Sequence, residues 1–147
     1  MSTKDVVWSH TEALLAEVLG CDPSELSCDA DGDWPVRARS GGYWVRVLPG
    51  RRPHVEVFSR VVEDIDLDPG LLEEINDWNR RLAHANAFWR DRAVWVTGQI
   101  VGTSMELDDL GCMTEEIAGE IHRVGPELAA RYGGNVLFPD GIEEGEV

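Results

Sequence analysis

The chain has few basic residues and no long apolar run, and each shortage excludes a class of protein. Its 147 residues include 13 Lys and Arg against 28 Asp and Glu, which gives a net charge of −15. Because so acidic a chain repels phosphate backbones, we expect no nucleic-acid partner. The longest apolar runs are only a few residues, too short to span a bilayer, so we expect no membrane partner.

Cysteine is also scarce, and the N-terminus lacks the apolar stretch of a secretory signal. The three cysteines make an odd count without the spacing of a disulfide framework, which is typical of a reduced, cytoplasmic protein. The length fits one domain. We expect that domain to cover residues 1–139 and an acidic, flexible tail to cover residues 140–147.

No catalytic or metal-binding motif is present. Two Asp-x-Asp-x-Asp stretches, beginning at Asp29 and Asp64, resemble the start of a calcium loop. Neither has Gly at the sixth position or Glu at the twelfth, so a solvated loop and a helix N-cap are the better interpretations. The four histidines are scattered, and there is no nucleophile elbow or phosphate loop. We therefore expect a non-enzymatic protein with no metal and no cofactor.

The hydrophobic pattern predicts helices and strands in the order α-β-β-β-α-β-β-α. Strands are expected where apolar and polar residues alternate, over residues 34–39, 43–48, 54–62, 86–90 and 93–101. Because the helices are too few for parallel βαβ units, the order predicts an α+β domain with an antiparallel sheet.

The helices are placed by their capping residues. Ser9-His-Thr-Glu12 reads as a capping box for the first helix, although the apolar residues before it also allow an earlier start. Asp68 followed by Pro69 predicts the start of the central helix. Thr114 is the expected cap of the last helix, and Pro126 should kink it.

Two groups of residues in these elements stand out. Asn76 and Asn79 lie on the central helix, where Asn is unfavourable, and this predicts a fixed polar contact to a strand edge or a loop. Trp78, between them, is expected in the core. The segment from Arg37 to Arg60 carries six arginines against the single acid Glu56, an unusual balance in so acidic a chain.

The strands of this arginine-rich segment contain the candidate binding residues. Alternation places Trp44, Arg46, Phe58 and Arg60 on one face, opposite the valines. Since Trp and Arg anchor many interfaces, we predict that these four residues bind a partner. The alternative is an ordinary outer sheet face on which arginines lie over aromatic rings.

The combined pattern resembles the YbjN-like family, whose fold is similar to that of type III secretion chaperones. The resemblance is carried by the element order, by Ile75-Asn76-x-x-Asn79, by the strand Ala93–Val101 and by Tyr132-Gly133-Gly134. It implies a small acidic α+β domain, often dimeric, that binds proteins or peptides, and it supplies no catalytic residue. Pro126, inside the last helix, departs from the unbroken helix that the family leads us to expect.

These observations favour a chaperone-like or regulatory module that binds a protein or peptide, and we expect it to be a homodimer. The alternative is an immunity or inhibitor protein, whose negative charge would attract a basic toxin or nuclease. An enzyme or small-molecule carrier is the weakest hypothesis, because no set of polar residues converges in the sequence.

Overall fold

The computed structural model describes residues 2–141, and it has the predicted α+β architecture. Within this range no helix combines the length and apolar character needed to cross a bilayer. The helices are α1 (Thr3–Leu19), α2 (Pro69–Arg81) and α3 (Leu107–Tyr132), with short 3-10 turns at Pro23–Glu25 and Gly102–Ser104. The strands are β1 (Trp34–Ala38), β2 (Gly41–Leu48), β3 (His54–Glu63), β4 (Asn86–Arg90) and β5 (Ala93–Val101).

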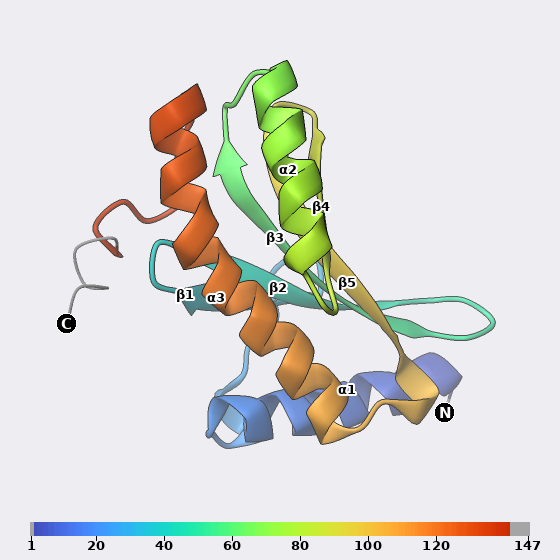
Figure 1. Cartoon of the computed structure of the whole chain (residues 1–147). Helices are drawn as coiled ribbons and strands as arrows, with labels where there is room; N and C mark the ends of the chain where they lie inside the picture. Colours follow the sequence, from blue (N-terminus) through green and yellow to red (C-terminus); the bar gives the residue numbers. More distant parts are fainter. Residues whose placement is uncertain (1, 142–147) are drawn as a thin grey trace.

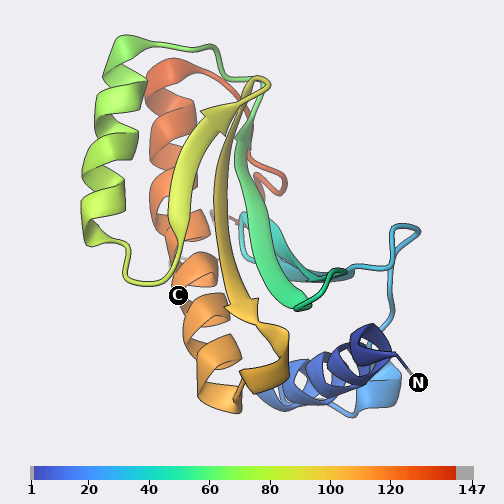
Figure 2. The same ribbon diagram turned by 90° about the vertical axis from the view of Figure 1, so that its right-hand side faces the viewer.

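The five strands form one antiparallel sheet in the order β1-β2-β3-β5-β4. Helices α2 and α3 lie along one face of this sheet, and α1 lies across one end, against α3 and β2 (Figure 1). Figure 2 shows that none of the helices in the described part of the chain covers the opposite face. We call that uncovered surface the outer face.

The core lies between the sheet and the two covering helices. As predicted, β2 and β3 direct their valines inward, and Val45, Val55 and Val57 are fully buried. Trp78 of α2 is buried as expected. The helices contribute a continuous apolar stripe, as their periodicity predicts. Its buried members include Leu71, Ile75, Leu110, Ile117, Ile121 and Leu128.

The first helix begins earlier than the predicted capping box at Ser9. Its N-cap is Ser2, whose hydroxyl accepts a hydrogen bond from the Asp5 backbone N–H, while the Asp5 carboxylate accepts one from the Ser2 N–H. The helix thus begins with the kind of capping box that was predicted, but the box is formed by Ser2 and Asp5 instead of Ser9 and Glu12. Val7 is buried, so packing of the first turns favours the longer helix.

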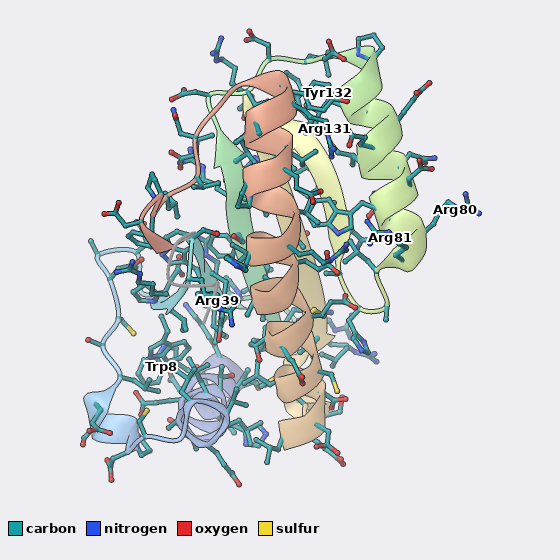
Figure 3. The ribbon with its side chains drawn as sticks, turned by 60° about the vertical axis from the view of Figure 1, so that its left-hand side comes forward. Trp8, Arg39, Arg80, Arg81, Arg131 and Tyr132 are labelled. Atoms are coloured by element: carbon teal, nitrogen blue, oxygen red, sulfur yellow. The ribbon has the colours of Figure 1, made fainter. Side chains whose placement is uncertain are left out.

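The last helix also begins before its predicted cap. The Asp109 carboxylate accepts the backbone N–H of the N-cap residue Glu106, whereas Thr114 lies inside the helix with its hydroxyl donating to the Leu110 carbonyl. The helix then continues past Pro126 to Tyr132 (Figure 3). Proline removes a backbone bond there but does not end the helix.

Candidate functional site

The structure brings all four predicted residues together on the outer face. Trp44 of β2 and Phe58 of β3 are direct cross-strand partners, and their rings stack with centroids 5.8 Å apart and planes 16° from parallel. Arg46 and Arg60 lie on the same side by strand alternation. The result is an aromatic pair with arginines beside it, on the side of the sheet that has no helix.

Both arginines also lie over aromatic rings, as the alternative interpretation of this face predicts. The guanidinium carbon of Arg46 is 4.6 Å from the centre of the Phe58 ring, and that of Arg60 is 5.2 Å from the centre of Trp95. These cation–π contacts hold the side chains flat against the sheet. These contacts order the surface, and the rings of Trp44, Phe58 and Trp95 stay partly exposed.

The face extends beyond the four predicted residues. Trp95 of β5 is paired with Arg60 across the strands and with Phe88 of β4. Sequence alternation placed Trp95 opposite the valines of its own strand. That pattern does not reveal the order of the strands, however. We therefore did not predict that Trp95 lies next to Arg60 of β3.

Two hollows mark the outer face. One, of about 430 Å³, is lined by Arg46, Phe58, Phe88 and Trp95 with neighbouring polar residues. The other, of about 360 Å³, shares Arg46, Phe58 and Trp95 and adds Trp44 and Leu137. Concave surfaces that combine apolar walls with a few charged groups suit the side chains of a bound peptide.

Arg46 is fixed by a buried carboxylate. Its Nε lies 3.0 Å and 3.1 Å from the two carboxylate oxygens of Asp33, and its terminal nitrogen lies 2.7 Å from Oδ2. Only 3% of Asp33 is exposed. Hydrogen bonding to Asp33 raises the pKa of Arg46 against a smaller opposing effect of burial. Arg60, in contrast, pairs with the partly exposed Glu63.

The Asp29 stretch, which resembles the start of a calcium loop, supplies this carboxylate. One oxygen each from Asp29, Asp31 and Asp33 lie within 4.8 Å of one another. Oδ1 of Asp29 accepts the backbone N–H groups of Asp31 and Asp33, and Asp33 binds Arg46. The stretch is a hydrogen-bonded loop beside the outer face. We expected a solvated loop, but Asp33 is buried.

The prediction of a polar contact from the central helix is confirmed for Asn79. Its side-chain amide nitrogen donates to the Ala87 carbonyl at 2.8 Å, and its Oδ1 accepts from the Ala87 N–H at 2.7 Å. Ala87 belongs to the edge strand β4, so α2 covers part of this edge. Asn76 is exposed and makes no side-chain hydrogen bond among residues 2–141.

A second polar contact that the sequence did not predict holds the connection between α2 and β4. The carboxylate of Glu116, on α3, accepts the backbone N–H groups of Ala83, His84 and Ala85, each at 2.9 Å. Burial alone would raise the pKa of Glu116, but these hydrogen bonds together lower it. No local signal indicates this contact, because Glu116 lies 31 to 33 positions further along the chain than its partners.

A further concave surface lies between α1 and α3. This groove, of about 510 Å³, has Val18, Leu19 and Leu107 among its apolar residues. Its charged lining residues are all acidic, Glu17, Asp108 and Glu115. It contains none of the four predicted binding residues.

A family model described as T3SS (YopN, CesT) and YbjN peptide-binding chaperone 1 matches residues 5–140. A search of curated proteins gave no match. Among solved structures, the fold is similar to that in the crystal structure of the ExsC–ExsE complex. That match has a TM-score of 0.60 and 17% identity, and it covers 80% of this chain and 92% of the other.

A second solved structure with this fold is the Yersinia pestis type III secretion chaperone SycH in complex with a stable fragment of YscM2. It matches with a TM-score of 0.56 and 14% identity, covering 80% of this chain and 98% of the other. Both likenesses confirm the fold expected from the element order. The family match over residues 5–140 confirms the resemblance carried by the two Asn, the strand and the Gly pair. The chain therefore belongs to the family of T3SS and YbjN peptide-binding chaperones.

Proposed function

We propose that this protein is a non-enzymatic, cytoplasmic chaperone that holds an extended segment of a partner protein on its outer face. The observation that carries the proposal is the stacked Trp44–Phe58 pair on the face without helices. Family membership supports peptide binding, and the fold is shared with ExsC and SycH, each crystallised with a protein partner.

The chemistry of the outer face suits such a segment. Trp44, Phe58 and Trp95 offer apolar surface that is already ordered, and ordered anchors lose little conformational entropy on binding. The arginines beside them can donate hydrogen bonds to backbone carbonyls or carboxylates of the segment. A partner segment rich in apolar side chains therefore fits this face, because Asp33 and Glu63 already balance the charges of Arg46 and Arg60.

The test begins with the partner. Cross-linking in the native host followed by mass spectrometry identifies the bound protein, and the cross-linked segment is then made as a peptide. Calorimetry compares its affinity for the parent chain and for the Trp44→Ala/Phe58→Ala variant. Loss of two central aromatic anchors should raise Kd at least about tenfold.

The matched control is Val6→Ala, which removes an exposed apolar side chain from α1, away from the outer face. This variant should bind like the parent. Unchanged affinity of the Trp44→Ala/Phe58→Ala variant, with its circular dichroism spectrum intact, would show that the partner binds elsewhere. The acidic α1–α3 groove would then be the next surface to substitute.

We also propose that the chaperone works as a homodimer. Leu67 and Leu72, near the start of α2, are 55% and 45% exposed, which is high for large apolar side chains. Burying them against a second copy would remove apolar area from water. Light scattering should give the mass of a dimer for the parent and of a monomer for Leu72→Glu. A parent that is monomeric at all concentrations would contradict this part of the proposal.

A further inference from the structure

The chain's own C-terminal segment lies on the outer face. We call residues 135–141 the strap. After α3, Gly133 and Gly134 adopt positive φ angles of 81° and 98° and turn the chain back towards the sheet. The strap then runs to the turn between β1 and β2, and its end lies beside β1 (Figure 1).

Backbone hydrogen bonds hold the strap at its first residue and at its middle. Asn135 pairs with Glu63 at the end of β3 through two bonds of 2.8 Å. The Phe138 N–H donates to the carbonyl of Ser40, in the turn between β1 and β2, also at 2.8 Å. The strap therefore passes from the end of β3 to the β1–β2 turn with a defined conformation.

Two side chains of the strap border the predicted binding surface. Leu137 lines the 360 Å³ hollow together with Trp44, Phe58 and Trp95. The Phe138 ring lies under the guanidinium of Arg37, with 4.2 Å between the guanidinium carbon and the ring centre. Leu137 and Phe138 also line a smaller, almost wholly apolar hollow of about 260 Å³, which includes Trp44.

This contact is built like that of a bound peptide. The Phe138 ring packs against an arginine, Leu137 lines the same hollows as Trp44, and the backbone bonds to the sheet at Asn135 and Phe138. Leu137 and Phe138 are half-buried, and neither belongs to the hydrophobic core. Segments with few buried contacts open at a lower free energy than the whole domain.

We propose that the strap is an internal ligand of the outer face, and that a partner segment binds by displacing it. The inference rests on the proposed function of that face and narrows the class of partner. The partner segment is extended and carries an aliphatic residue followed by an aromatic one, the pattern of Leu137-Phe138. In the free protein the strap shields Trp44 from other apolar peptides.

The expected effect follows from competition. A segment tethered by a short linker acts at an effective concentration in the millimolar range, so even a weak internal ligand covers its site. If the strap is docked about 90% of the time, the apparent Kd for a partner is about tenfold higher than without it. Removing the strap should therefore increase affinity by about that factor.

The experiment compares three chains: the full protein, a chain ending at Gly141 and a chain ending at Asn135. The chain ending at Gly141 keeps the strap and is the matched control. The probe is a synthetic peptide of residues 135–141, titrated to about 5 mM to cover the effective concentration of a tethered segment. Binding is followed by NMR on the ¹⁵N-labelled proteins, including the indole signals.

The peptide should bind the chain ending at Asn135 and shift the indole signals of Trp44 and Trp95. It should bind the other two chains at least about tenfold more weakly. A peptide with Ser at the positions of Leu137 and Phe138 should not bind. Equal binding to all three chains, or no binding to the chain ending at Asn135, would overturn the inference.

A second variant guards against loss of folding on truncation. Leu137→Ser/Phe138→Ser in the full chain keeps the backbone bonds to Glu63 and Ser40 but removes the apolar contacts. It should bind the peptide more tightly than the parent does, but less tightly than the shortest chain, because the backbone of its strap still pairs with Glu63 and Ser40. Binding no tighter than that of the parent would contradict the inference. The result is separable from the proposed function, because Trp44→Ala/Phe58→Ala tests partner binding whether or not the strap competes.

Discussion

The side-chain amide of Asn79 bonds to both backbone groups of Ala87, as a neighbouring strand would. Helix α2 thereby supplies a hydrogen-bonding partner on the edge of β4 that faces away from β5. The contact explains why an Asn is tolerated inside α2, where its helix propensity is poor.

Replacing Asn79 should weaken the packing of α2 on β4. Asn79→Ala leaves the Ala87 N–H and carbonyl without their partner, and we expect the free energy of unfolding to fall by about 1–3 kcal/mol. Urea unfolding followed by circular dichroism measures the change. Asn76→Ala, on an exposed position of the same helix, is the control and should cause no loss. Equal destabilisation by the two variants would contradict a special role for Asn79.

The carboxylate of Glu116 should make stability depend on acid pH. Its pKa is lower in the folded protein than in the unfolded chain, because three backbone N–H groups bind the charged form. Its stabilising contribution is thus complete above the unfolded pKa, and it is lost as pH falls through the folded pKa.

Urea unfolding between about pH 6 and pH 3 tests this dependence. Glu116→Gln should lower the stability at pH 6 by about 1–3 kcal/mol and flatten the acid limb of the curve. Glu115→Gln, at the exposed neighbouring position, should follow the parent curve. An acid limb that is equally steep in all three proteins would assign the pH dependence to other carboxylates.

The two arginines of the outer face should differ in their effect on stability. Arg46→Met leaves the buried carboxylate of Asp33 without its main partner, at a cost of about 1–3 kcal/mol. Arg60→Met breaks an exposed pair with Glu63 and should cost less than about 1 kcal/mol. A double-mutant cycle with Asp33→Asn isolates the pair, and a coupling energy near zero would refute this difference.

Two glycines should respond to alanine with opposite sign. At Gly102, directly after β5, a Cβ would lie 2.9 Å from the Pro53 carbonyl oxygen and would collide with the Val7 side chain, so Gly102→Ala should destabilise the protein by about 1–3 kcal/mol. Gly119 lies on α3 with open space around it, and Gly119→Ala should stabilise by up to about 1 kcal/mol. Thermal unfolding of both variants checks the prediction. Stabilisation by Gly102→Ala would mean that the Pro53 backbone moves aside at no cost.

Local patterns in the sequence predicted the elements well where a single signal dominated. The hairpin of β4 and β5 has the predicted bounds, and Asp68 caps α2 as expected. The caps expected at Ser9 and Thr114 were wrong because capping residues occur more than once near each start, whereas the earlier start that the sequence allowed for the first helix is confirmed. Ser2 and Glu106 were chosen over Ser9 and Thr114 by the packing of the preceding turns, which only the folded chain defines.

The part of the candidate site that depends on alternation within single strands was predictable from the sequence. It placed Trp44, Arg46, Phe58 and Arg60 on one face, and the register of β2 and β3 brings them together. Trp95 joins them because β5 lies next to β3, a relation of distant segments. Leu137 comes from the stretch just before the expected tail, and nothing in its local sequence indicates that it lies beside Trp44.

The covered edge of the sheet also bears on how selective recognition can be. Backbone pairing at an open strand edge accepts almost any sequence and invites copies of the protein to polymerise. Here Asn79 binds both backbone groups of Ala87 on the edge strand β4. The other edge strand, β1, is short and contains Pro35, which has no backbone N–H to donate. In the binding mode that we propose, recognition is thereby directed from the sheet edges to the aromatic face, where a client is selected by its side chains.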